Sequence, residues 1–207
     1  TLAGNAAHPS VLEQAGVHRV TDLAAVPDDV TVPRLQRETL DNLRAQARLQ
    51  VASRGKPVPE IELLEPAHDR GLSRLPAPSV GDVHFDFEGD PNWGDEGLEY
   101  LWGTLYDAED GVRYEPRWAT SRAEERAALE DWIDWLTERL ERHPDLHVYH
   151  YNSYEPVALK RLVARHATRE EKLDDLLRRK VFVDLYGITR QTLRAGVESY
   201  GLKPMEA

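Results

Sequence analysis

The sequence predicts an α/β fold in which a mixed sheet is flanked by helices and preceded by a small helical domain. Two observations support this prediction. From about residue 83 onward, short apolar runs typical of strands alternate with helical runs, whereas the residues before 55 show helical periodicity alone. Five prolines within 55–82 favour an extended linker between the two parts. We therefore expect a helical domain over 1–54, a linker over 55–82 and an α/β domain over 83–207.

The predicted helical domain contains two short amphipathic segments followed by one longer helix. The turn Gly16-Val17-His18 joins the short segments, and "VPRLQRETLDNLRAQARLQVASR" provides the longer helix. The short pair resembles a helix-hairpin-helix unit, in which a glycine-containing turn presents backbone N–H groups to a phosphate. A plain helical packing module is the alternative.

The order of elements after the linker predicts the mixed sheet. Ser121 and Glu124 have the spacing of a capping box and open a long amphipathic helix. Pro156 suits the first turn of a later helix. In order, we expect a strand over 83–89, a hairpin of strands over 98–107 and 112–120, a helix over 121–143, a strand over 146–152, helices over 155–166 and 168–180, and a strand or helix start over 181–193.

Composition narrows the class of protein. Hydrophobic residues make up 41% of the 207-residue chain, which is enough for a core, and the absence of cysteine excludes disulfides and thiolate metal sites. No run of about 18 apolar residues and no leader-like segment occur, so we expect no membrane span and a cytoplasmic location. The net charge of −11 argues against a simple phosphate-binding surface but allows a local acidic metal site.

Two carboxylates alternate with apolar residues in "VHFDFEGDPNW" at 83–93. In a strand, Asp86 and Glu88 point to one face, and Phe85 and Phe87 point to the other. Acids on a half-buried strand are unfavourable unless something offsets their charge, and Mg²⁺ or Mn²⁺ prefers such ligands. Gly89 allows close approach of backbone or substrate. An edge strand with a solvated polar face is the alternative.

Three further polar residues stand where elements change. Asn152 ends a predicted strand, and Glu155 lies at the start of the next helix, where α/β sheets place ligands. Asp184 lies in an apolar run. Two of them have ordinary structural alternatives, because Glu155 suits the helix dipole and Asp184 suits an N-cap. For His147 and His150 in the strand, we expect packing or hydrogen-bonding roles.

Together these segments resemble the ribonuclease-H-like DEDD exonuclease superfamily, and more narrowly the predicted ribonuclease-H-like domain of RecB-family nuclease proteins. The resemblance is carried by "FDFEGDP", "VYHYNSYEPVALKRL", "LLRRKVFVDLYGITRQ" and "SYGLKPMEA". It implies a ribonuclease-H-like fold, with Asp86 and Glu88 as first-motif metal ligands and Glu155 as the second-motif ligand. Asn152 matches the family's Asn before that ligand, and Asp184 matches the acid of the "VDL" segment.

The sequence departs from the family pattern in two places. Glu155 stands where the family usually has Asp, which lengthens the side chain by one methylene and favours a water-mediated contact to a metal ion. The family's last acidic motif follows the "LK..E" segment, where this sequence ends. We therefore expect a piece of a longer polypeptide, truncated before that motif, with weak or absent activity of its own. The resemblance identifies no general base here.

The resemblance implies a metal-dependent nuclease that cleaves phosphodiester bonds of DNA or RNA as a 3′–5′ exonuclease. Two Mg²⁺ or Mn²⁺ ions would be held by Asp86, Glu88 and Glu155, with Asp184 as a further catalytic acid. A PD-(D/E)xK nuclease or a helicase would be the neighbouring domain in the parent protein. A catalytically decayed nucleic-acid-binding or docking module is one alternative, and a structural domain with a solubilising acidic face is another.

Basic side chains on the helices after Asn152 are candidates for contacts to phosphate groups. Four acidic residues are interleaved among them, so a solvated face with i,i+4 ion pairs is the alternative. The residues expected to bind nucleic acid are Asn152, Lys160, Arg161, Arg178 and Arg179.

Overall fold

The structure is a computed structural model that describes residues 9–206, which form two compact units. One unit spans Leu75–Leu185, and the other combines the residues up to Arg74 with those from Tyr186 onward. Residues 186–206 therefore pack with the N-terminal helices, whereas the sequence interpretation groups them with the α/β domain.

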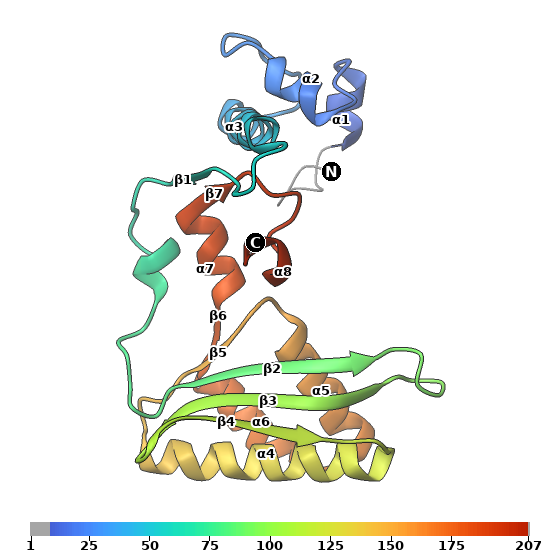
Figure 1. Ribbon diagram of the computed structural model, residues 1–207, viewed down its shortest axis with the longest axis vertical. Coiled ribbons are helices and arrows are strands. Elements are labelled where there is room, and N and C mark those ends of the chain that lie inside the picture. Colours follow the sequence, from blue (N-terminus) through green and yellow to red (C-terminus); the bar gives the residue numbers. More distant parts are fainter. Residues whose placement is uncertain (1–8, 207) are drawn as a thin grey trace. The chain divides into compact units, whose positions relative to one another are not determined.

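The Leu75–Leu185 unit is built on a five-stranded mixed sheet flanked by helices, which confirms the predicted fold class (Figure 1). Its strand order is β4-β3-β2-β5-β6. The pairs β2–β3 and β3–β4 are antiparallel, and the pairs β2–β5 and β5–β6 are parallel. The strands are β2 (Val83–Asp90), β3 (Leu98–Ala108), β4 (Gly111–Trp118), β5 (Val148–His150) and β6 (Phe182–Asp184).

Three helices of this unit contribute to the core on one face of the sheet (Figure 1). They are α4 (Arg122–Arg142), α5 (Tyr154–His166) and α6 (Glu170–Arg178). Side chains of β2 alternate, so Phe85 and Phe87 are buried while Asp86 and Glu88 are exposed on the other face. Phe85 stacks on Trp132 of α4, with 4.0 Å between ring centroids. Burial of the phenylalanines thus turns the two acids away from the core.

Helix α4 begins where the capping signal predicts. Ser121 Oγ accepts a hydrogen bond from the Glu124 N–H at 3.3 Å. The Glu124 carboxylate accepts hydrogen bonds from the hydroxyl and the N–H of Thr120, at 2.7 and 2.6 Å. These two bonds lower the pKa of Glu124. The first turn of the helix is therefore tied to the chain that leads into it.

The other unit contains the N-terminal helices α1 (Pro9–Gln14), α2 (Val20–Ala25) and α3 (Arg37–Ser53). They surround an apolar cluster that includes Leu23 and Leu40. Among residues 9–206, no helix is long and apolar enough to cross a membrane.

A two-stranded sheet joins the predicted linker region to the C-terminal residues of the same unit. Strand β1 (Ile61–Leu63) pairs antiparallel with β7 (Leu193–Ala195). Gln46 and Gln50 of α3 donate hydrogen bonds to the carbonyls of Ala195 and Val197, both at 2.8 Å. These long-range bonds explain why the C-terminal residues belong to this unit. Its remaining elements are the 3₁₀ helix η1 (Gly71–Arg74), α7 (Leu185–Thr192) from its second residue onward, and α8 (Leu202–Met205).

An ion-paired aspartate connects α4 to the start of α6. Arg169 donates two hydrogen bonds to Asp134, from Nε to Oδ1 at 2.8 Å and from Nη2 to Oδ2 at 2.7 Å. Lys172 Nζ lies 2.6 Å from Oδ1. The bonds from Arg169, supported by Lys172, lower the pKa of Asp134 from 3.8 to about 2. A depressed carboxyl pKa adds stability that is present above the unfolded-state pKa and is lost as the pH falls through the folded-state pKa.

We expect Asp134→Asn to lower the free energy of unfolding at pH 7 by about 1 kcal/mol. This loss is smaller than the lowered pKa of Asp134 would give for a buried carboxylate. The Asp134 side chain is 32% exposed, and solvent screens its ion pair with Arg169. The difference in the free energy of unfolding between wild type and Asp134→Asn should become smaller as the pH falls from 4 towards 2, because Asp134 then becomes protonated. Urea unfolding followed by circular dichroism at pH 7, 4 and 3 measures it. A penalty that stays constant over this range would contradict the ion pair.

Candidate functional site

The predicted acidic residues gather at the edge of the sheet where the parallel strands end. Strands β2, β5 and β6 run in the same direction, so their carboxyl ends meet at one edge. Asp184 ends β6 and pairs in register with His150, which ends β5. Asp86 and Glu88 lie in the carboxyl half of β2, and Glu155 lies in the first turn of α5.

Asp86 and Glu155 are close enough to form a side-chain hydrogen bond. Desolvation, the charge of Glu155, this hydrogen bond and the charge of Glu88 raise the pKa of Asp86 from 3.8 to about 6. A hydrogen bond from the Phe87 N–H, at 2.9 Å, opposes the rise. The Asp86 side chain is accessible to solvent, which limits the effect of desolvation. We therefore attribute the raised pKa mainly to the neighbouring carboxylates of Glu155 and Glu88. Neighbouring carboxyl groups that raise one another's pKa favour a shared proton or a bound cation over two free charges.

Glu155 has an unsatisfied oxygen in a buried position. The residue is 3% exposed, and its Oε2 has no hydrogen-bond partner among the described residues. His150 Nδ1 lies 3.3 Å from Oε2 but donates its hydrogen to the Asn152 carbonyl at 2.6 Å, since a carbonyl can only accept. Because this N–H hydrogen is used by the Asn152 carbonyl, the 3.3 Å distance from His150 Nδ1 to Glu155 Oε2 is a contact and not a hydrogen bond. Oε2 is therefore available to a cation.

The loop between β5 and α5 is held in a defined conformation. Asn152 has a φ of +79°, in the left-handed region that asparagine adopts more readily than most residues. Its N–H donates to Asp184 Oδ1 at 2.9 Å, and its side-chain Oδ1 accepts from the Ser153 N–H at 2.8 Å. Asp184, Asn152 and His150 thus fix the loop that carries Glu155 to the edge of the sheet.

Two residues beside the site were not singled out in the sequence. Glu99 on β3 is 3% exposed and accepts a hydrogen bond from the Tyr154 hydroxyl, whose oxygen lies 2.9 Å from Oε1 and 3.1 Å from Oε2. It also pairs with Arg161 of α5, so this predicted nucleic-acid-binding residue is engaged inside the protein. Tyr154 directly precedes Glu155. The available signal was an acid inside the β-prone run "LEYLWGTLYD", because glutamate is rarely buried unless it is paired.

A divalent cation fits the chemistry of this edge. Within residues 9–206, no Lys or Arg forms an ion pair with Asp86, Glu88 or Glu155. Over the same residues, no three or more His, Cys, Asp or Glu side chains are grouped so that they could hold a metal ion. Mg²⁺ commonly binds through one or two carboxylates, retained waters and substrate phosphates. Asp86 together with Oε2 of Glu155 suits that mode, and Glu88 is near enough to act on the charge of Asp86.

Arg178 and Arg179 are not brought to the acidic edge. They end α6 and precede β6, so they lie at the amino edge of the sheet, whereas Asp184 ends the same strand at the carboxyl edge. Arg178 pairs with Asp174 at 2.7 Å and Arg179 pairs with Asp175 at 2.9 Å. Lys160 is exposed on α5.

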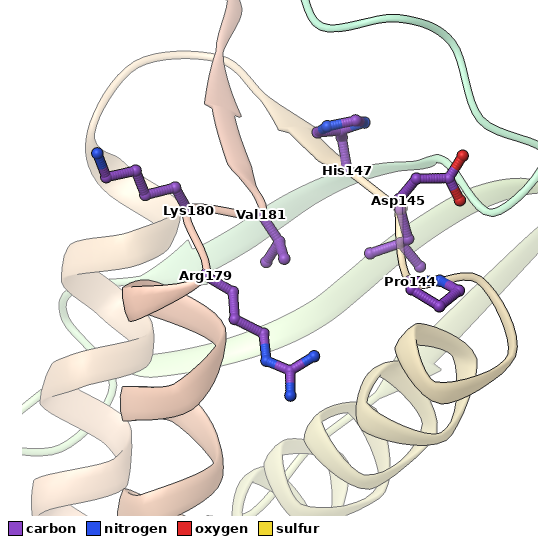
Figure 2. A pocket seen from close by; sticks show the side chains of 7 residues that line it. Pro144, Asp145, His147, Arg179, Lys180 and Val181 are labelled. Atoms are coloured by element: carbon purple, nitrogen blue, oxygen red, sulfur yellow. The ribbon is translucent and has the colours of Figure 1, made fainter.

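Figure 2 shows a pocket of about 350 Å³ at the amino edge. In that view Arg179 and Lys180 point in different directions, and Arg179 is paired with Asp175. These cations therefore do not converge on one ligand. The lining residues are Pro144, Asp145, Leu146, His147, Arg179, Lys180 and Val181.

The turn of the predicted helix-hairpin-helix unit lies between α1 and α2. Gly16 has a φ of +80°, in the left-handed region that glycine adopts readily. The N–H groups of His18 and Arg19 both donate to Asp22 Oδ2, at 3.1 and 2.9 Å. A phosphate would have to displace Asp22 to reach these two donors. Phosphate binding at this turn stays a prediction.

The comparisons with known proteins agree with the fold. A family model described as the RNase_H superfamily matches residues 83–207, which is more than half of the chain. The match includes the strand with Asp86 and Glu88, the helix with Glu155 and the strand with Asp184. No curated protein and no solved structure matches the chain. The chain therefore belongs to the RNase H superfamily.

Proposed function

We propose that the RNase H domain is a metal-dependent nuclease that cleaves phosphodiester bonds of DNA or RNA as a 3′–5′ exonuclease. Membership of a superfamily whose fold is typically that of nucleic-acid hydrolases supports the reaction class. One observation carries the proposal. The Asp86 and Glu155 carboxyl groups meet at the carboxyl edge of the sheet, with a buried Glu155 oxygen that no hydrogen-bond donor satisfies.

In this proposal Asp86 and Glu155 would hold Mg²⁺ or Mn²⁺, as one ion or as a pair, together with retained waters and a substrate phosphate, and Glu88 would be a further carboxylate ligand or neighbouring charge. The bound ion supplies polarisation of the phosphodiester and a water of lowered pKa. Asp86 and Glu88 lie on the exposed face of β2, where a nucleic-acid strand can reach them. Asp184 and His150 act by holding the β5–α5 loop, which keeps Glu155 at the edge of the sheet.

The wider context is also proposed. We place the chain in a RecB-family nuclease protein, beside a PD-(D/E)xK nuclease or a helicase domain, acting on nucleic acid in the cytoplasm. Lys160 is exposed on the helix that carries Glu155, so it is the predicted basic residue best placed to meet a phosphate near the site.

A second candidate function is a nucleic-acid-binding or docking module that does not cleave. One observation favours it. Among residues 9–206, no three or more acidic or histidine side chains are grouped so that they could hold a metal ion. This candidate predicts binding of nucleic acid with no cleavage at any metal concentration.

We expect Asp86→Asn and Glu155→Gln each to lower the cleavage rate at least about a hundredfold, because each removes a charge that holds the cation. The assay uses 3′-end-labelled single-stranded DNA and RNA with Mg²⁺, with Mn²⁺ and with EDTA. Asp107→Asn is the matched control, since Asp107 is an exposed acid on neighbouring β3 near the other end of that strand.

The assay separates the candidates. Cleavage that EDTA abolishes and that both site variants lose supports the nuclease. Binding without cleavage, both by this chain and by a version extended past Ala207, supports the docking module. Cleavage that persists in EDTA or in Asp86→Asn would contradict the metal-dependent mechanism at these residues.

A further inference from the structure

We infer that Glu99 is a positioning residue that fixes Glu155 against the strand bearing Asp86 and Glu88. The inference rests on the proposed function, since it concerns the geometry of the same metal site. It assigns a role to a residue that lies outside the acidic motifs. Glu99 acts through Tyr154, the residue that directly precedes Glu155.

Glu99 is tied to the first turn of α5. Its carboxylate accepts the one Tyr154 hydroxyl hydrogen, which lies between Oε1 at 2.9 Å and Oε2 at 3.1 Å from the hydroxyl oxygen, and Oε1 pairs with Arg161. Burying a carboxylate is costly unless such partners offset the charge. Both oxygens are engaged, so Glu99 is suited to hold a neighbour in place. It is less suited to coordinate a metal ion than Glu155, whose Oε2 is unsatisfied.

Tyr154 in turn contacts the strand that carries the other acids. Its ring meets the Phe87 ring edge-on, with 6.4 Å between centroids, and Phe87 lies between Asp86 and Glu88 in the sequence. Tyr154 is 46% exposed, so packing alone does not hold its ring. The hydrogen bond to Glu99 therefore restricts rotation of the Tyr154 side chain. It also holds the first turn of α5, which contains Tyr154, in place.

Glu99 also lies directly against β2 at a local irregularity. It pairs in register with Gly89, and the register shifts between Glu88 and Gly89. A Cβ atom on Gly89 would lie 2.3 Å from Glu99 Oε2, closer than atoms can pack, and in tight contact with the Tyr154 hydroxyl oxygen at 3.1 Å. The absence of a side chain at Gly89 thus makes room for the Glu99–Tyr154 pair. One carboxylate contacts both elements that bring acids to the site.

The test measures Mn²⁺ affinity by isothermal calorimetry on the whole chain, with thermal unfolding recorded for every variant. We expect Glu99→Ala and Tyr154→Phe each to weaken Mn²⁺ binding about tenfold, the size of effect seen when groups that orient metal ligands are removed. The double variant should bind about as weakly as either single variant, because both break the same link. Glu99→Gln retains an acceptor for the Tyr154 hydroxyl and should stay within about threefold of wild type.

A matched control pair exists elsewhere in the sheet. Glu115 on β4 accepts a hydrogen bond from the Tyr106 hydroxyl at 3.0 Å and pairs with Arg117 at 2.7 Å. Tyr106 pairs in register with Val83, at the end of β2 away from Glu88. Glu115→Ala therefore removes the same chemistry at a distance from the acids, and we expect it to leave Mn²⁺ affinity unchanged.

The outcomes distinguish this inference from the proposed function. Wild-type affinity in folded Glu99→Ala and Tyr154→Phe, with binding still lost in Asp86→Asn, would overturn the inference alone. Equal loss of Mn²⁺ affinity in Glu99→Gln and Glu99→Ala, or a loss in Glu115→Ala, would also overturn the inference. The loss would then come from a general change in charge or stability and not from the Glu99–Tyr154 hydrogen bond. No Mn²⁺ binding by wild type, and no change in Asp86→Asn, would overturn the proposed metal site and this inference with it.

Discussion

Replacing Glu125 with alanine is expected to lower the free energy of unfolding by about 3–5 kcal/mol, because it leaves buried charges without their partner. Glu125 is fully buried. Its Oε1 accepts from the Glu99 N–H at 2.9 Å, and its Oε2 accepts from Arg122 at 2.5 Å and from His166 Nε2 at 2.9 Å. Arg165 Nη1 lies 3.5 Å away.

The pKa of Glu125 agrees with this assignment. Burial alone would raise that pKa, but the hydrogen bonds from Glu99, Arg122 and His166 hold it below its usual range. The ionised carboxylate is thus the form that the fold selects. It links the first turn of α4 to the start of β3 and the end of α5.

Urea unfolding at pH 7 measures the loss. Glu125→Gln keeps an acceptor and should give an intermediate loss, since the charge opposite Arg122 and Arg165 is removed. Glu138→Ala is the control, because Glu138 is exposed on the same helix and should change stability by no more than about 0.5 kcal/mol. A loss for Glu125→Ala as small as that of the control would contradict the buried network.

Local patterns made much of the Leu75–Leu185 unit predictable. The alternation of Phe85 and Phe87 with acids specified β2 and its faces, and the Ser121 signal placed the start of α4. Such features depend on a few residues that are neighbours in the sequence. Contacts between residues far apart in the sequence leave no such local pattern, so the hydrogen bonds from Gln46 and Gln50 to residues near the C-terminus could not be predicted.

The same distinction between local patterns and long-range contacts applies to the residues of the candidate site. The strand-end rule and the family resemblance together predicted that Asp86 and Glu155 meet. The sequence pattern grouped Arg178 with the site, whereas the short β6 strand separates that arginine from it. The buried roles of Glu99 and Glu125 depend on tertiary partners, and an isolated acid in an apolar run does not identify those partners.

The second large effect is expected for Trp132→Ala, which should lower the free energy of unfolding by about 3–5 kcal/mol. Trp132 is fully buried, stacks on Phe85 at 4.0 Å, and donates from Nε1 to Thr104 Oγ1 at 3.2 Å. Truncation leaves a large cavity beneath β2 and an unpaired threonine hydroxyl, and the surrounding strands can collapse into that space only in part.

The matched control for this second prediction is Trp118→Ala, since Trp118 on β4 is 63% exposed and should cost less than about 1 kcal/mol. The comparison tests more than packing. Successive side chains of a strand point to opposite faces, so the contact of Phe85 with Trp132 requires the neighbouring Asp86 to point away from the core. If urea unfolding gave equal losses for the two tryptophan variants, Trp132 would not be a core residue. The placement of Asp86 and Glu88 on the accessible face would then lose its physical basis.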